Sequence, residues 1–253
     1  MSDRNVLSVI PVRGVPAVRP GDDLADLLLR AIDASDIALA DGDVLAVCQK
    51  VVSKAEGAVA HLADVTPSPF AERIATTTGK EARLVEVILR ESRRIVRMDR
   101  GHLICETGPG WVCANAGVDA SNSLGPDTVI LLPRNVDASA ESLRARVAAA
   151  KGVWLGVVIT DTFGRPWREG LTEVALGVAG IDPFLDFRGR QDLDGRELLH
   201  TVMALADDIA CAAGLLMLKD RGVPAAVVRG APVVPGSGGG YRFVRPPESD
   251  LFR

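Results

Sequence analysis

The sequence predicts an α+β fold of mixed α/β architecture, formed as one domain over residues 1–253 whose two lobes have no marked boundary. Short apolar runs typical of buried strands occur at residues 44–47 and 153–160. Apolar residues recur at helical spacing over residues 22–39 and 196–219. The two kinds of segment do not alternate regularly, which disfavours a doubly wound parallel sheet.

The expected elements follow from local patterns along the chain. A strand over residues 6–10 ends at Pro11, and acidic residues open the helix after it. Turns and prolines separate the other apolar runs, which predicts strands at residues 44–47, 93–98, 102–105, 111–114, 128–132, 153–160 and 225–228. Helical spacing predicts helices at residues 22–39, 82–90, 139–151 and 196–219. The glycine-rich residues 235–240 are expected to be mobile.

Composition and charge exclude several classes of function. Hydrophobic residues make up 47% and charged residues 25% of the chain, the balance of a soluble globular protein. The net charge of -4 provides no basic field for nucleic acid or an anionic membrane. No apolar run is long enough to span a membrane, and residues 1–5 do not open a signal peptide. The cysteines form no C-x-x-C pair and are expected to be free thiols, so we expect a cytoplasmic protein.

Several common motifs of enzyme chemistry are missing. The P-loop pattern fails because Lys80 is followed by Glu81 and the upstream glycine is absent. Residues 236–241 (GSGGGY) lack the last glycine of the dinucleotide-binding fingerprint. The three histidines lie far apart in the sequence, which disfavours a zinc site or a histidine-activated nucleophile.

The segment after the most apolar strand, residues 161–170 (DTFGRPWREG), is the first candidate site. A carboxylate and a hydroxyl, at Asp161 and Thr162, suit a hard divalent cation. Arg165 and Arg168 are candidates for holding a phosphate or a carboxylate through forked hydrogen bonds. The alternative is that Asp161 caps a turn and the arginines are solvated, and this segment alone does not separate the two readings.

Two further segments follow apolar strands in the same way. Residues 114–122 (ANAGVDASN) form a loop of small and polar residues around Asp119, which is suited to wrap a metal and a nucleotide. Residues 49–57 (QKVVSKAEG) carry Lys50 and Lys54, equal candidates for a phosphate contact unless they are simply solvated. Two aspartates that each leave an apolar strand favour a shared metal site.

Together these three segments resemble the coenzyme F420-0:L-glutamate ligase family, the gamma-glutamyl ligases of F420 biosynthesis. The likeness begins at residues 10–24 (IPVRGVPAVRPGDDL) and ends at residues 245–253 (RPPESDLFR). It implies a mixed α/β fold that forms an intertwined homodimer. It also implies an enzyme that adds L-glutamate to coenzyme F420-0, uses GTP as co-substrate, and requires Mg²⁺ or Mn²⁺, with K⁺ in addition in some members.

The resemblance assigns roles to individual residues. Asp119, Asp161 and Thr162 match metal ligands of the family. Positions that contact the nucleotide are matched by Val15, Pro16, Ala17, Val18, Gln49, Lys54 and Asn122. The family's glycine-rich segment near the C-terminus supplies a glutamine in some members, and residues 237–242 (SGGGYR) have none. Ser237, a backbone carbonyl or water is therefore expected to complete the site.

The implied mechanism begins with transfer of the GTP γ-phosphate to the terminal carboxylate of the acceptor, and the amine of glutamate then displaces the phosphate. Two other functions stay open. One is a GTP-binding regulatory protein without ligase activity, and the other is an amide ligase that acts on a different acid. The family contains stand-alone enzymes and chains fused to a flavin domain, and an end at Arg253 suits both.

Overall fold

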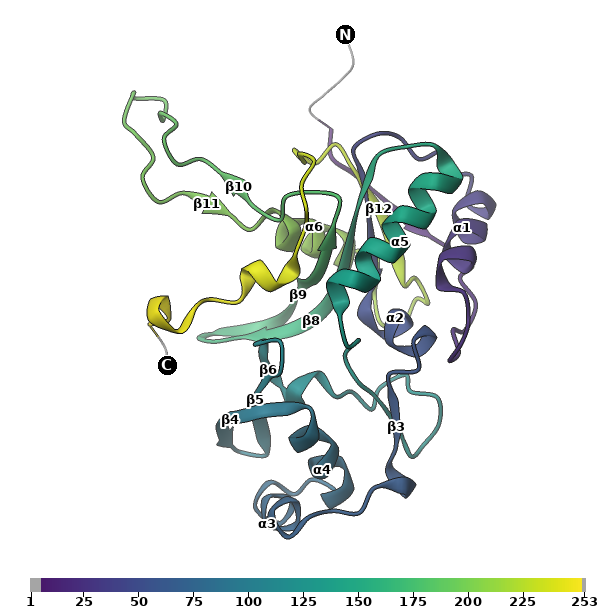
Figure 1. Cartoon of the computed structure of the whole chain (residues 1–253), viewed down its shortest axis with the longest axis vertical. Coiled ribbons are helices and arrows are strands. Elements are labelled where there is room, and N and C mark those ends of the chain that lie inside the picture. The colour runs from purple at the N-terminus through teal and green to yellow at the C-terminus, as the bar shows by residue number, and fades with distance from the viewer. Residues whose placement is uncertain (1–5, 252–253) are drawn as a thin grey trace.

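A five-stranded mixed sheet forms the body of the computed structural model, which describes residues 6–251 (Figure 1). Across the sheet the strands are β1 (Ser8–Val12), β12 (Ala225–Arg229), β2 (Asp43–Cys48), β8 (Leu155–Arg165) and β9 (Arg168–Ala179). β2 and β8 run parallel, and the other neighbours are antiparallel. Residues 1–5, which bear on the signal-peptide expectation, and residues 252–253, where the resemblance ends, lie outside the described part.

Helices cover both faces of this sheet, which explains the continuous apolar sequence of β2 and of the first half of β8. α1 (Leu24–Ala34), α2 (Gln49–Ala55) and α5 (Val136–Lys151) pack on one face, where Leu28 and Ile159 are among the buried residues. α6 (Leu205–Gly214) covers the opposite face. The main sheet thus has a hydrophobic core on each side.

A second lobe with its own core lies below the main sheet in Figure 1. Ile88 and Leu103 are fully buried in it. Its elements are β3 (Val59–His61), η1 (Leu62–Asp64), α3 (Pro69–Thr78), α4 (Ala82–Arg90), β4 (Ser92–Asp99), β5 (His102–Thr107), β6 (Val112–Ala114), η2 (Asn115–Gly117) and β7 (Thr128–Ile130). β4, β5 and β6 form one antiparallel sheet, and β3 pairs with β7.

A long arm projects from the body between β9 and α6 (Figure 1). Its base is the antiparallel pair of β10 (Leu185–Asp186) and β11 (Val202–Met203). Leu193, near the end of the arm, is fully exposed. After β12 the chain ends in two short helices, η3 (Gly240–Phe243) and η4 (Pro247–Ser249).

Two of the expected helices have other bounds in the structure, and three elements were not expected at all. The helix expected at residues 196–219 is confined to α6, because residues 189–198 pair with each other in the arm. The helix expected from Ser139 begins at Val136, where the Asn135 side chain accepts a hydrogen bond from the Ala138 N–H. The sequence patterns missed α2, α3 and β9 altogether.

The glycine-rich residues 235–240, expected to be mobile, are packed against the main sheet. The N–H of Gly239 donates to the carbonyl of Val178 in β9 at 2.9 Å. The N–H of Gly240 donates to Oδ1 of Asp137 at 2.6 Å. These contacts tie the segment to β9 and to the start of α5. Within residues 6–251, no helix has both the length and the apolar character needed to cross a membrane.

Candidate active site

The carboxyl ends of the parallel strands β2 and β8 lie at the same edge of the main sheet. β2 ends at Cys48, which is paired with Thr160 of β8. α2 begins directly after β2 with Gln49, and Asp161 directly follows Thr160. Ligands of α/β sheets commonly bind outside the carboxyl ends of parallel strands. This edge of the sheet is therefore the natural position for a site.

The loop expected at residues 161–170 is a β-hairpin, because β8 continues to Arg165 and β9 returns alongside it. Asp161 lies opposite Val174, and Thr162 lies opposite Glu173. Successive side chains of a strand point to opposite faces, so Asp161 and Thr162 leave the hairpin on different sides. The Thr162 hydroxyl donates to Oε1 of Glu173 at 2.6 Å, which fixes a third carboxylate next to the site but outside the pocket wall.

The Asp119 carboxylate is supplied by the second lobe. The chain leaves β6 through η2, where Asn115, Ala116 and Gly117 all have left-handed backbone conformations. Asp119 then forms a two-hydrogen-bond bridge with Ile130 at the end of β7. Its Oδ1 accepts a 2.6 Å hydrogen bond from the N–H of Ser121. The bridge to Ile130 thereby fixes the backbone at Asp119, and the hydrogen bond from Ser121 fixes its carboxylate.

One pocket of about 310 Å³ collects the residues expected to bind metal. Asp119, Asp161 and Thr162 all line it, although they come from two lobes of the chain. The remaining lining residues are Leu84, Cys113, Ala114, Asn115, Gly117, Val118, Ala120, Phe163, Gly164, Leu171 and Lys219. The structure thus brings together the two aspartate segments for which the sequence favoured a shared site.

The two aspartates of the pocket have opposite electrostatic surroundings. Burial raises the pKa of Asp161 to about 7; the Thr162 N–H opposes this effect and the Glu173 charge adds to it. Burial also acts to raise the pKa of Asp119, but hydrogen bonds from Lys50 and Ser121 outweigh it and hold that pKa below its usual value. Asp161 is therefore the carboxylate that most lacks a compensating positive charge.

Lys50, rather than Lys54, contacts a residue of the pocket wall. The Lys50 ammonium lies 2.7 Å from Oδ2 of Asp119. Lys54 is one turn further along α2, and its pKa is lowered by burial and by the neighbouring Lys50 charge. From the sequence the two lysines were equal candidates, and the geometry gives Lys50 a defined partner. Lys54 stays a predicted nucleotide contact.

Two buried polar atoms at this edge of the sheet have no hydrogen-bond partner within the described residues. They are Nε2 of Gln49 and Oγ1 of Thr160. The Gln49 side chain is anchored by its other polar atom, since Oε1 accepts from the Ser53 hydroxyl at 2.8 Å. Buried polar atoms are normally satisfied, so this pair indicates a place for water or for polar ligand atoms.

The other residues expected to contact the nucleotide lie outside the pocket wall. Val18 is buried in the core beside α2, and residues 15–17 precede it on the way from β1. The segment is tied to the end of α2 by the hydrogen bond from the Gly21 N–H to the Ala55 carbonyl. Asn122 is exposed and has a left-handed backbone, with φ of 54°. The sequence could not place these residues relative to Asp161.

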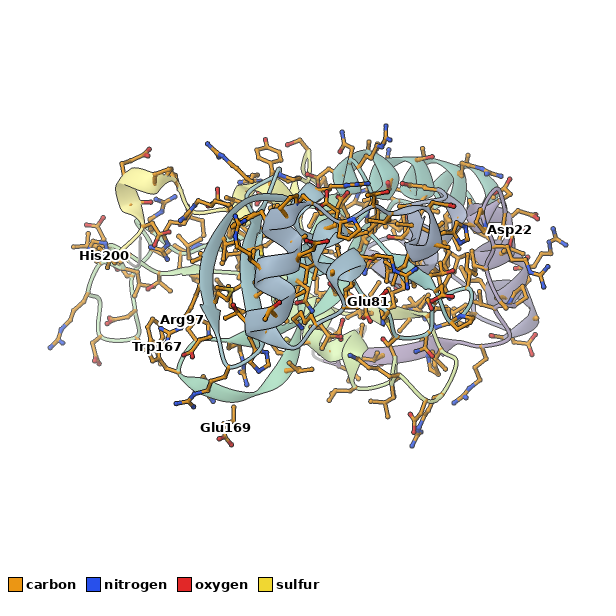
Figure 2. All side chains as sticks on the ribbon, turned by 90° about the horizontal axis from the view of Figure 1, so that it is seen from below. Asp22, Glu81, Arg97, Trp167, Glu169 and His200 are labelled. Atoms are coloured by element: carbon orange, nitrogen blue, oxygen red, sulfur yellow. The ribbon has the colours of Figure 1, made fainter. Side chains whose placement is uncertain are left out.

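The predicted substrate-binding arginines are at the tip of the hairpin. Arg165 and Arg168 are paired in the β8–β9 register, and both are exposed. Nη2 of Arg165 donates to the Glu169 carbonyl at 3.0 Å, so this guanidinium folds back onto its own turn. Figure 2 shows Trp167 and Glu169 at the outer edge of the molecule, with the Glu169 side chain directed away from the ribbon. The tip therefore extends beyond the pocket.

Ser237 is not brought to the pocket of Asp119 and Asp161. It lines a different one, together with Asp137 and Arg144 of α5 and Gly180 beyond the end of β9. By contrast, Glu173 joins the site without having been expected. A carboxylate inside the run TEVALGVA was its only signal in the sequence, and that signal has meaning only once β9 is recognised as the partner of β8.

The donor set suits a divalent cation that is also bound by a substrate phosphate. Within residues 6–251, no three His, Cys, Asp or Glu side chains are grouped so that they could hold a metal by themselves. Mg²⁺ is usually held by one or two carboxylates together with phosphates and waters, rather than by a complete protein cage. Asp119 and Asp161 supply two carboxylates in one pocket, and the Lys50 ammonium already shows that Asp119 binds a cation.

Comparisons with known proteins identify the family to which this chain belongs. The profile of the family described as F420-0:Gamma-glutamyl ligase matches residues 14–230. A protein of Methanopyrus kandleri named coenzyme F420:L-glutamate ligase is 48% identical, and the match covers 98% of each chain. Proteins of the same name from Methanothermobacter thermautotrophicus and Archaeoglobus fulgidus are 45% and 43% identical; these matches cover 98% of this chain and 99% and 96% of theirs. The chain therefore belongs to the F420-0:gamma-glutamyl ligase family.

Proposed function

We propose that this protein ligates L-glutamate to coenzyme F420-0 and couples the ligation to conversion of GTP to GDP and phosphate. The observation that carries the proposal is the shared pocket of Asp119 and Asp161 at the carboxyl ends of β2 and β8. Membership of the family and the names of the relatives support glutamate as the amine and F420-0 as the acid.

Asp119 and Asp161, with an oxygen of Thr162, would hold Mg²⁺ or Mn²⁺. A divalent cation bound there would offset phosphate charge and polarise the phosphoryl group that is transferred. A K⁺ ion is a further proposed activator, to which no residue is assigned. Lys54, Gln49, Asn122 and residues 15–18 are proposed to contact the nucleotide.

The chemistry requires activation of a carboxylate, since an ionised carboxylate has no adequate leaving group for attack by an amine. A carboxylate oxygen of the acceptor attacks the γ-phosphorus of GTP, which forms an acyl phosphate and releases GDP. The glutamate nitrogen then attacks the acyl carbon, the carbon–oxygen bond to phosphate breaks, and the amine loses a proton. No protein nucleophile takes part, so the free thiols of the cysteines have no role in it.

Arg165 and Arg168 are proposed to position a carboxylate of the acceptor or of the incoming glutamate. Both guanidiniums are exposed at the tip of the hairpin whose residues Phe163, Gly164 and Leu171 line the pocket. Guanidinium groups bind carboxylates through two parallel hydrogen bonds, which fixes orientation as well as charge. In this role they would contribute to the Michaelis constant for glutamate or acceptor more than to nucleotide affinity.

Formation of a homodimer is part of the proposal. The arm places Leu193 and Leu199 in exposed positions far from the main core, where they gain nothing from folding of the single chain. Exposed apolar side chains on a projecting hairpin favour packing against a second chain. Light scattering coupled to gel filtration measures the mass directly. A monomeric wild-type protein at micromolar concentration would contradict this part of the proposal.

The central test is a ligation assay read by mass spectrometry. Purified protein is incubated with F420-0, L-glutamate, GTP, Mn²⁺ and K⁺, and each component is omitted in turn. We expect one or two glutamyl units to be added, and the addition to require GTP and Mn²⁺. Asp161→Asn and Asp119→Asn should each abolish ligation, while Asp64→Asn, at an exposed position in the second lobe, should not. Unchanged turnover and GTP affinity in Asp161→Asn would falsify the assignment of the site.

The same assay separates the alternatives. A regulatory GTP-binding protein would bind GTP but release no phosphate when acceptor and glutamate are both present. An amide ligase for another acid would release phosphate with glutamate only when a different acid replaces F420-0. The proposal predicts phosphate release that depends on both glutamate and F420-0.

A further inference from the structure

Lys50 is held beside the pocket, against Asp119 and Ser121, by contacts that use its whole ammonium group. The nitrogen lies 2.7 Å from Oδ2 of Asp119, and it donates to the Ser121 hydroxyl at 2.7 Å. The carbonyl oxygen of Ser121 is a third acceptor at 3.4 Å. The Lys50 side chain is only 13% exposed. These contacts join α2 of the main body to a turn 71 residues further along the chain.

The carboxylates near Lys50 outnumber the cations in contact with them. The charges of Glu173 and Asp119 both act on Asp161, and Lys50 is the cation that opposes them there. Lys219 lines the same pocket but is exposed. A cluster of carboxylates without a counter-charge repels itself, and a divalent cation and an ammonium ion relieve that repulsion in the same way.

We propose that Lys50 is a resident cation of the pocket, which neutralises Asp119 and orders the 119–121 turn until a divalent cation displaces it from that carboxylate. This inference rests on the metal site of the proposed function. Lys50 is thus a positioning residue that competes with the metal. The competition lowers the affinity for free metal, and it keeps the turn ordered in the protein before metal binds.

The resident-cation role of Lys50 predicts two effects of removing the ammonium group, a gain in metal affinity and a loss of stability. Removal of the ammonium should strengthen metal binding, because one competitor for Asp119 is gone. It should also destabilise the metal-free protein, because the carboxylates lose their counter-charge and the turn loses its anchor. A lysine with a merely structural role would lower stability without raising metal affinity.

The experiment is a titration of the nucleotide-free protein with Mn²⁺, followed by electron paramagnetic resonance or calorimetry. Lys50→Met keeps the aliphatic stem and removes the charge. We expect Mn²⁺ to bind Lys50→Met about tenfold more tightly than wild type. This factor follows from the energy of interaction between unit charges a few ångströms apart at a partly solvated site. The metal-free variant should unfold at a lower temperature, and added Mn²⁺ should raise that temperature more than in wild type.

Matched variants distinguish the effect of the contact between Lys50 and Asp119 from the effect of net charge. Lys219→Met removes an equal charge from the pocket wall but no contact with Asp119, and it should change Mn²⁺ affinity by less than about threefold. Lys50→Arg keeps the positive charge and should stay close to wild type. If Lys50→Met does not fold, Lys50→Gln replaces it in the same titration.

The outcomes also separate this inference from the proposed function. Loss of Mn²⁺ binding in Asp161→Asn supports the metal site whatever Lys50 does. If that loss occurs but Lys50→Met and Lys50→Gln bind Mn²⁺ no more tightly than wild type, the resident-cation role is overturned alone. If neither wild type nor the Lys50 variants bind Mn²⁺, either without nucleotide or with GDP present, the role and the metal site are both overturned.

Discussion

The Thr162 hydroxyl donates a 2.6 Å hydrogen bond to Oε1 of Glu173 across the β8–β9 hairpin. Through this contact the carboxylate of Glu173 is held close enough to Asp161 that its charge helps to raise the pKa of Asp161. The predicted metal ligand Thr162 is therefore coupled to an acidic residue that no local sequence pattern indicated. The charge and the hydrogen bond of Glu173 can be tested separately.

Glu173→Gln should weaken Mn²⁺ binding while the protein stays folded. Glutamine keeps an oxygen that accepts from Thr162, so only the negative charge is lost. At pH 8 we expect the affinity for Mn²⁺ to fall about fivefold. Glu169→Gln is the matched control, because Figure 2 shows this side chain pointing away from the molecule. Equal effects of the two substitutions would contradict a local role for Glu173.

Arg229→Met should destabilise the main sheet. Nε and Nη2 of Arg229 donate to the two oxygens of the buried Asp43 carboxylate at 2.8 and 2.7 Å. Loss of the arginine leaves Asp43 without its counter-ion. Since Arg229 is partly exposed, we expect a loss of about 2–3 kcal/mol in the free energy of unfolding, below the usual cost of breaking a fully buried pair.

The control for this prediction is Arg30→Met, which breaks an exposed pair with Asp26 on α1. Exposed pairs of this kind contribute less than about 1 kcal/mol. Urea denaturation of both variants measures the difference. If the two variants lose the same stability, the Arg229–Asp43 pair is no stronger than a surface contact.

Asp207→Asn should stabilise the protein increasingly as the pH rises. Burial raises the pKa of Asp207, against the hydrogen bond that its Oδ1 accepts from the Ala175 N–H at 2.8 Å. The folded state therefore holds the proton at pH values where the unfolded state has lost it. Wild-type stability then falls as the pH rises from about 3.8 through the folded pKa.

Asparagine can still accept from Ala175 but does not ionise. The unfolding temperature of Asp207→Asn minus that of wild type should be larger at pH 7 than at pH 4. Asp208→Asn changes the net charge equally in the same turn of α6 and serves as the control. A difference between Asp207→Asn and wild type that does not grow with pH would show that burial of Asp207 does not disfavour its ionisation.

Gly240→Ala should detach the glycine-rich segment from β9. A Cβ at position 240 would lie 2.0 Å from the Leu176 carbonyl oxygen, where the backbone of β9 leaves no room for it. We expect a loss of about 2 kcal/mol or more and faster proteolysis within residues 235–245. Gly108→Ala, with nothing within 4 Å of the added atom, should leave both measurements unchanged.

Local sequence was sufficient for the elements whose apolar residues follow a regular pattern. α4 occupies residues 82–90 as expected, and the apolar runs at residues 44–47 and 225–228 lie in β2 and β12. In each case the spacing of the apolar residues indicates directly which sides of the element are buried. The two aspartates, which each follow an apolar strand and lie within a motif of the family, stay predicted site residues that the structure brings to one pocket.

The sequence by itself thus determined the mixed α/β class and the family, and it singled out Asp119 and Asp161 as predicted site residues. The tertiary structure alone decided that β8 continues past Asp161, that β9 carries Glu173 to Thr162, and that Lys50 binds Asp119. The contacts of Thr162 with Glu173 and of Lys50 with Asp119 join residues 11 and 69 positions apart. Strand register and the packing of the two lobes decide which distant residues meet. The spacing of apolar residues depends only on near neighbours along the chain, so it contains no information about these contacts.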